Sequence, residues 1–244
     1  MRYFILLLLF TLISCSRTFH VADIQQRNSR IEKASYPVDV KTAAIIEPYK
    51  LKLEETMNEV IGYNEVEMTK GKPQSSLTNW FADALLDEAQ KLVSDPLDFA
   101  VQNYGGIRIP VLSAGDVTVN KIYELMPFDN IMFVLELKGE VVQMLFDKMA
   151  ESGGWPVSRN VYFEIAYGKA KNIKIKGEPL DINKIYYAAI PDYVAQGGDN
   201  AVFLKDAKSH NTEALIRDML INHVRESKLK GLNIKADLSP RIIE

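Results

Sequence analysis

The hydrophobic period changes part-way along this chain, and that change constrains the fold more than any other feature. In residues 40–92 the apolar side chains mostly recur every three or four positions, as they do on one face of a helix. The stretch "NIMFVLELKG", residues 130–139, is instead a partly alternating apolar run that predicts a strand. Helices and strands therefore follow one another in mixed order, with several strands adjacent. This order predicts an α+β fold, a single layered α/β domain of mixed sheets and helices, and not a regular βαβ array.

Two helices are predicted in the first half of the chain. The first begins near Val40, with Pro48 in its first turn. Its apolar stripe consists of Ile46, Tyr49, Leu53, Met57, Val60 and Ile61. The second helix is capped by Ser75 or Ser76 and stops before "DP" at residues 95–96. Its buried face consists of Leu77, Trp80, Phe81, Ala84, Leu85 and Leu92.

Strands dominate the middle of the chain, and a helix closes it. Besides residues 130–139, strands are expected in "PLDFAVQN", "VYFEIAY", "KNIKIKG" and "KIYYAAIP". Helical spacing returns in "GEVVQMLFDKMAE", residues 139–151, through Val141, Leu145 and Met149. A last helix, "TEALIRDMLINHVRES", is expected from Thr212. Residues 39–244 are therefore predicted to form one domain.

The N-terminus has the pattern of a targeting segment. Residues 1–14 carry a basic Arg2 and an apolar run too short to span a bilayer, which predicts a signal peptide. Leu12-Ile13-Ser14 before Cys15 resembles a bacterial lipobox, so we expect a lipid on Cys15. The alternative is an ordinary secretory signal with an incidental cysteine. Polar residues 15–38 are interpreted as a tether, which predicts a lipid-anchored protein of the bacterial cell envelope, on the periplasmic or surface side.

Composition restricts the class of ligand. The chain is 47% hydrophobic and 25% charged, which allows a substantial core. Its formal charge of −3 gives no basic footprint for DNA or RNA. A small anionic ligand would have to be captured by individual arginines or lysines.

Three loops contain residues suited to such a ligand. In "NYGGIR", residues 103–108, glycines allow close approach to backbone N–H groups, and Arg108 offers a planar fork for a phosphate or carboxylate. "MPFDN", residues 126–130, places Phe128 beside polar residues, although a phenylalanine near a strand start is more often in the core. "DYVAQGGDN", residues 192–200, places an aromatic ring near Asp199. Ordinary turn chemistry explains each loop equally well when it is taken alone.

Together these loops resemble the C-terminal domain of the bacterial and animal 5′-nucleotidase family. That domain carries N-G-G-G-I-R, then P-F-x-N, then F-L-A-x-G-G-D, and this chain has "NYGGIR", "PFDN" and "YVAQGGD" in the same order. "SSLTNWFADAL", "GDVTVNKIYELMPF", "GGWPVSR" and "DLSPRI" are similar to further family segments. Tyr104 replaces a family glycine and Tyr193 a phenylalanine. The resemblance extends from about Val40 to the C-terminus.

The resemblance implies a set of substrate-binding residues. In the family two rings hold the nucleobase between them, and these rings map onto Phe128 and Tyr193. Asp199 would contact the ribose hydroxyls. Asn103 and Gly105 fall where the family touches substrate, and Arg108 falls where it binds phosphate or base. A phosphate-binding arginine usually found before the first helix motif is missing here, and Lys72 is the nearest cation.

The chemistry of the family belongs to a different domain, a metallophosphoesterase with two metal ions. This chain has three histidines, His20, His210 and His223, and no D-x-H or G-N-H-[DE] cluster. We therefore expect no catalytic residue and no metal or cofactor in this chain, and divalent metals only in a partner metallophosphoesterase. Three hypotheses follow: the nucleotide-recognition half of a split hydrolase, a non-enzymatic surface lipoprotein that binds nucleosides or nucleotides, and a self-sufficient hydrolase with a cryptic site.

Overall fold

A computed structural model of the protein describes residues 38–244. The predicted signal peptide at 1–14, Cys15, His20 and all but the last residue of the predicted tether lie outside the described residues. The chain divides into two units, Met1–Glu47 and Pro48–Glu244. All the sheets of the described residues belong to the second unit. None of the helices within residues 38–244 is both long and apolar enough to cross a membrane.

Helix α2 (Val40–Met57) forms where a helix is predicted, but two details of the prediction are wrong. Pro48 lies in the interior of the helix and not in its first turn. Val60 and Ile61 do not continue the helix, because they begin strand β1 (Val60–Asn64). Ile61 is buried as a strand residue, whereas no residue of α2 is buried.

Helix α3 (Ser76–Gln90) confirms the second predicted helix, and Ser75 is its N-cap. The Ser75 hydroxyl accepts from the N–H of Thr78, and the Thr78 hydroxyl accepts from the N–H of Ser75. This capping box satisfies two donors that the first turn of a helix leaves free. Leu92 is 43% exposed, so its assignment to the buried face was wrong. The helix has already ended at Gln90.

The central sheet has the strand order β11-β6-β10-β3. The strands are β3 (Phe99–Ala100), β6 (Ile131–Lys138), β10 (Ile185–Pro191) and β11 (Lys208–Leu215). Strands β3, β6 and β10 confirm predicted strands. β3 pairs parallel with β10, whereas the other two pairs of this sheet are antiparallel.

Strand β11 was not predicted, because Thr212 was expected to begin a helix. Thr212 lies in β11, and helix α7 (Ile216–Leu229) begins four residues later. β11 is an exposed edge strand whose register with β6 shifts between Asn211 and Leu215. A polar edge strand with such a shift lacks the alternation of apolar residues that marks a strand in a sequence.

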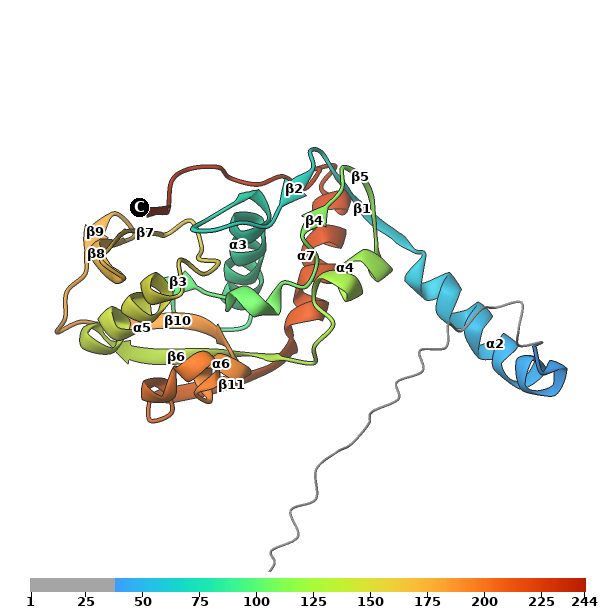
Figure 1. The fold of residues 1–244 in the computed structure, drawn as a ribbon, viewed down its shortest axis with the longest axis horizontal. Coiled ribbons are helices and arrows are strands. Elements are labelled where there is room, and N and C mark those ends of the chain that lie inside the picture. Colours follow the sequence, from blue (N-terminus) through green and yellow to red (C-terminus); the bar gives the residue numbers. More distant parts are fainter. Residues whose placement is uncertain (1–37) are drawn as a thin grey trace, which may run out of the picture. The chain divides into compact units, whose positions relative to one another are not determined.

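The sheet is buried on both faces, and each face contributes to a separate core. In β6 and β10, Val134 and Ala189 belong to one core, together with residues of α3, α4 (Val119–Leu125) and α7. The next residues, Leu135 and Ala188, belong to the other core, with residues of α5 (Gly139–Glu151). Alternation of side chains across the strands produces this division. In Figure 1, α5 lies toward the left of this unit and α4 with α7 toward the right.

A second sheet, of order β12-β7-β8-β9, completes the core around α5. Its strands are β7 (Val161–Ala166), β8 (Lys169–Ile175), β9 (Glu178–Pro179) and β12 (Ile242–Ile243). Two small sheets pair β1 with β5 (Gly115–Thr118) and β2 (Met68–Thr69) with β4 (Val111–Leu112). Short helices cover Asp192–Ala195 (α6), Tyr104–Gly106 (η2), Gly198–Asn200 (η3) and Val202–Leu204 (η4). The observed mixture of helices and mixed sheets confirms the predicted fold class.

Arg241 fixes the C-terminal segment to this fold. Its side chain is 1% exposed and donates to both carboxylate oxygens of Asp83, over 2.8 and 2.7 Å. It also donates to the backbone carbonyl of Val157 over 2.9 Å. This bidentate arginine–carboxylate pair neutralises a buried charge that would strongly destabilise the fold if it were left unpaired.

Candidate functional site

Strand direction brings three loops to one edge of the central sheet. Because β3 and β10 are parallel, the loops that follow them, 102–108 and 192–200, leave at the same edge. Because β6 is antiparallel to β10 and Met132 pairs with Pro191, the loop before β6 (126–130) also lies there. Leu215 of β11 pairs with Ile131, so α7 begins at the same edge.

A pocket of about 610 Å³ opens where these loops meet, a volume typical of small-molecule sites. It is lined by Asn103, Gly105, Gly106, Arg108, Phe128, Asp129, Asn130, Tyr193 and Asp199. All six residues predicted to bind substrate are among them, and they come from all three loops. The fold therefore brings these residues together, whereas their role in binding stays a prediction.

The two aromatic residues of the pocket are accessible. Phe128 is 40% exposed and Tyr193 47% exposed, so Phe128 is not the core residue that its position before a strand would favour. Gly198 packs against the Tyr193 ring, since a Cβ at position 198 would lie 2.5 Å from Tyr193 Cε1. The guanidinium carbon of Arg108 lies 5.5 Å from the centre of the Phe128 ring, within cation–π range.

Asp199 is held by residues from two loops. Asn103 Nδ2 donates to Asp199 Oδ2 over 2.7 Å, and the Tyr193 hydroxyl donates to Asp199 Oδ1 over 3.2 Å. Behind Asn103, Gln102 Nε2 donates to Asn103 Oδ1 over 2.9 Å. Asp199 itself has the left-handed backbone angles φ 51° and ψ 32°, which non-glycine residues seldom adopt. Such a conformation persists where surrounding contacts hold it, and it is common at binding sites.

Three pocket residues were not predicted as site residues: Gly106, and Asp129 and Asn130 of the quoted "PFDN" motif. Asn130 Nδ2 donates to Asp192 Oδ1 over 2.7 Å and so connects the loop of Phe128 to the loop of Tyr193. Asp129 forms an ion pair of 2.6 Å with Arg217 at the start of α7. Burial, the largest single effect, disfavours the charge of Arg217. The hydrogen bond to Asp129, together with the electrostatic effects of Tyr123, Asp129 and Asp218, outweighs burial, so the pKa of Arg217 is raised. No signal in the sequence connects residue 217 with this loop.

The two glycines of "NYGGIR" have different roles. A Cβ at Gly106 would lie 1.8 Å from Gln102 Nε2, so glycine is needed there to make room for a buried amide. A Cβ at Gly105 would lie 3.6 Å from Asn103 Nδ2, an ordinary contact distance. Both glycines line the pocket, but only Gly105 is exposed there, whereas Gly106 is buried and its backbone N–H donates to the carbonyl of Asn103 over 2.9 Å.

Tyr104, which stands where the resemblance places a glycine, lies beneath two lysines. The Nζ atoms of Lys70 and Lys72 lie 4.0 and 4.7 Å from the centre of its ring. Lys70 Nζ also donates to the carbonyl of Ile107 over 2.7 Å. Burial, followed by the nearby charges of Arg108 and Lys72, lowers the pKa of Lys70. Within residues 38–244, no acidic side chain forms an ion pair with any of these three cations, so the cluster can attract an anion.

A sequence profile described as "5′-nucleotidase, C-terminal domain" matches residues 56–206, more than half of the chain. The chain belongs to the 5′-nucleotidase C-terminal domain family.

Curated relatives of this 5′-nucleotidase C-terminal domain are longer proteins. The chain is 33% identical over 135 residues to the protein UshA of Escherichia coli K12, which covers 53% of this chain and 24% of that protein. It is 28% identical over 193 residues to the NAD 5′-nucleotidase of Haemophilus influenzae, covering 66% of this chain and 31% of that protein. The chain thus spans about a quarter to a third of the length of these relatives.

Solved structures agree on the fold of this 5′-nucleotidase C-terminal domain. The 5′-nucleotidase precursor from Thermus thermophilus superposes with a TM-score of 0.71 at 24% identity, covering 86% of this chain and 44% of that one. The NAD nucleotidase of Haemophilus influenzae gives a TM-score of 0.65 at 20% identity, covering 84% and 41%.

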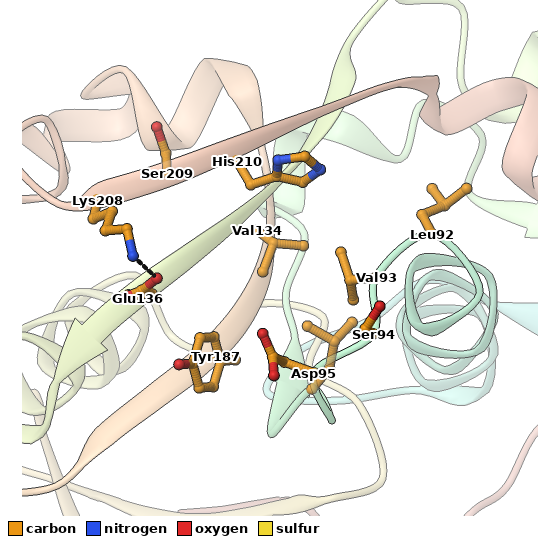
Figure 2. Close-up of a pocket in the computed structure, with 11 residues that line it drawn as sticks. Leu92, Val93, Ser94, Asp95, Val134, Glu136, Tyr187, Lys208, Ser209 and His210 are labelled. Atoms are coloured by element: carbon orange, nitrogen blue, oxygen red, sulfur yellow. Dashed lines mark hydrogen bonds and ion pairs between the residues drawn. The ribbon is translucent and has the colours of Figure 1, made fainter.

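A second cavity of this domain, of about 540 Å³, contains one of the three histidines. It lies between the loop after α3 and the strands β6, β10 and β11, and Figure 2 shows His210 and Asp95 on opposite sides of it. At its rim the Lys208 ammonium donates to the Glu136 carboxylate, which raises the pKa of Lys208. His223 lies elsewhere, with Nδ1 3.3 Å from a carboxylate oxygen of Glu88. Between residues 38 and 244, no three His, Cys, Asp or Glu side chains form a group that could hold a metal ion.

Proposed function

We propose that this domain is the nucleotide-recognition half of a 5′-nucleotidase-like hydrolase. The nucleobase stacks between Phe128 and Tyr193, Asp199 accepts hydrogen bonds from the ribose, and Arg108 binds the phosphate end. Asn103 and Gly105 line the path between base and phosphate. The observation that carries the proposal is that six residues from three separate loops line one pocket of suitable volume.

The energetics favour a ligand with both an aromatic and an anionic part. Stacking a base on an aromatic side chain is worth about 1–3 kcal/mol per base. Both rings are already partly exposed, so binding removes apolar surface from water without opening either core. Arg108 adds a charge-assisted contact, and Lys70 and Lys72 increase the positive potential behind it. A neutral aromatic ligand would use only the first of these contributions.

We infer that a separate metallophosphoesterase chain supplies two divalent metals and the activated water, and that it meets this domain at the mouth of the pocket. The sequence motivates this assignment, because it has the substrate-loop motifs and no cluster of metal-binding motifs.

Reconstitution tests the proposal. The full chain mixed with a metallophosphoesterase should hydrolyse nucleoside monophosphates, and Phe128→Ala and Tyr193→Ala should each weaken this activity about tenfold, as expected from lost stacking. Tyr63→Ala is a matched control, since Tyr63 is also 47% exposed but lies on β1, outside the pocket. Activity indifferent to both pocket variants would reject the proposal.

A second candidate is a non-enzymatic surface lipoprotein that captures nucleosides or nucleotides. The lipobox-like segment before Cys15 favours it, because a tethered binding protein needs only an anchor and a pocket. Calorimetry on the isolated chain, combined with a turnover assay of an added phosphoesterase, separates the two functions. The lipoprotein function predicts binding of AMP-like ligands with no increase in the turnover of any added phosphoesterase, whereas the hydrolase function predicts that increase.

A further inference from the structure

Two side chains of the pocket donate hydrogen bonds to the Asp199 carboxylate. Asn103 donates to Oδ2 over 2.7 Å, and the Tyr193 hydroxyl donates to Oδ1 over 3.2 Å. An ionised carboxylate accepts about four hydrogen bonds. Each oxygen therefore retains room for one more donor, and Asp199 is exposed where it lines the pocket.

The Tyr193 hydroxyl also holds the main chain of Asp199. It accepts a hydrogen bond of 3.3 Å from the backbone N–H of Asp199, in addition to donating to the carboxylate of the same residue. Asp199 and Asn200 both have positive φ, 51° and 64°, so this turn needs contacts to maintain its shape. One phenol oxygen thus fixes both the backbone and the side chain of Asp199, and a phenylalanine ring could do neither.

On the other side of the carboxylate, the side-chain amides of Gln102 and Asn103 form a chain of hydrogen bonds that ends on Asp199. The donors and acceptors of this chain can be arranged in only one way. Because the carboxylate only accepts, Asn103 must turn its NH₂ group toward Asp199 and its carbonyl oxygen toward Gln102. Gln102 is 0% exposed and Asn103 is 8% exposed, so little water competes for these groups. Asp199 is therefore held from the interior by Asn103 and from the solvent side by Tyr193.

Two free acceptor positions on one carboxylate match two neighbouring hydroxyl groups. A ribose offers its 2′- and 3′-hydroxyls as adjacent donors, whereas a 2′,3′-dideoxyribose offers none. A ligand without these hydroxyls would cover a carboxylate that has lost water and gained no partner. Sites built to pair with a hydroxyl discriminate strongly against analogues that lack it.

We propose that the Tyr193 hydroxyl positions Asp199 as a receptor for the ribose diol, so that the pocket selects ribonucleotides over nucleotides without these hydroxyls. The inference rests on the proposed function and names its substrate class. In this account the ring of Tyr193 contacts the base, while its hydroxyl acts through Asp199. The hydroxyl is therefore a positioning group for specificity.

Calorimetry on the full chain tests the inference with four ribonucleoside 5′-monophosphates, AMP, GMP, CMP and UMP, and their 2′,3′-dideoxy counterparts. The measured quantity is the ratio of dideoxy to ribo Kd for each base that binds. We expect a ratio of at least ten in the wild-type protein, at least a threefold smaller ratio in Tyr193→Phe, and a ratio near one in Asp199→Ala. If the hydroxyl only stabilises the fold, Tyr193→Phe would weaken the binding of ribo and dideoxy ligands equally and leave the ratio of their Kd values unchanged.

Tyr162→Phe is the matched control. The Tyr162 hydroxyl donates to a Glu164 carboxylate oxygen over 3.0 Å on strand β7, outside the pocket, so its removal should leave the ratio at the wild-type value. Nucleotide binding with a ratio that Tyr193→Phe leaves unchanged or increases would overturn the inference and leave the proposed function standing. Failure of the wild-type chain to bind any of the four ribonucleotides would overturn both.

Discussion

The side chains of Asn130 and Asp192 connect the two loops that carry the aromatic rings of the pocket. Asn130 Nδ2 donates to Asp192 Oδ1 over 2.7 Å, and the backbone N–H of Tyr193 donates to the same oxygen over 2.7 Å. One carboxylate oxygen therefore joins the two loops. The sheet alone determines only that the loops leave from the same edge.

Removing this connection should weaken nucleotide binding more than it weakens the fold. For Asn130→Ala we expect the Kd for AMP or UMP to rise about 3- to 10-fold, because one net hydrogen bond contributes about 0.5–1.5 kcal/mol. Calorimetry measures the effect, and thermal unfolding confirms that the domain remains folded. Asn120→Ala removes a comparable amide–carboxylate bond, to Glu124 on α4, and should leave the Kd unchanged. Equal effects of the two variants would contradict the prediction.

The two glycines of the 102–108 loop should respond differently to the same substitution. Gly106→Ala forces the fully buried Gln102 amide to move, so we expect it to destabilise the domain by about 1–3 kcal/mol, as overpacking does. Gly105→Ala meets only an ordinary contact and should leave the thermal midpoint within about 1 °C of the wild type. Differential scanning calorimetry on both variants checks the prediction, which is wrong if Gly105→Ala is the more damaging change.

The lowered pKa of Lys70 predicts an alkaline loss of phosphate affinity. Deprotonation of Lys70 removes a positive charge near Arg108, and the lowered pKa places this loss below the usual lysine range. The affinity for AMP should therefore fall as pH rises through that region, whereas the affinity for adenosine should not. Lys70→Gln should weaken AMP binding at neutral pH and flatten its pH dependence. A parallel fall for adenosine would indicate unfolding and not loss of the charge.

Arg241→Met should destabilise the domain strongly. The substitution leaves the Asp83 carboxylate without its two-pronged partner and frees the C-terminal segment. Breaking a buried ion pair by removing one member destabilises by about 3–5 kcal/mol. Chemical denaturation measures the loss. Lys208→Met, which removes an exposed ion pair with Glu136, should change stability far less than Arg241→Met does.

The spacing of apolar residues correctly predicted those helices and strands in which the apolar positions are the buried ones. Residues 139–151 repeat their apolar positions with helical spacing, and residues 131–138 form an apolar run that alternates only in part. The helix predicted from the first pattern and the strand predicted from the second are both confirmed. The prediction failed where burial does not mark the element. β11 is an exposed edge strand, so Thr212 carried no signal that a strand and not a helix passes through it. Likewise Ile61 fits the helical spacing of α2 but lies in strand β1, where its side chain is buried in the core.

The sequence predicted which loops form the pocket, but it did not predict the contacts that hold those loops in place. The motif order pointed to the six predicted residues, and the parallel pairing of β3 with β10 explains why they meet. The contacts that hold them could not be predicted, because Asp192 and Arg217 are separated in sequence from the side chains they bind. Such partners depend on strand register, which is a property of the whole sheet.

Strands β6 and β10 present neighbouring side chains to two different cores. Because these strands belong to both cores, unfolding of one core disrupts the packing of the other, and we expect one cooperative unfolding transition. A nucleotide bound at the end of these strands would then slow amide hydrogen exchange on both sides of the sheet, far beyond the residues it touches.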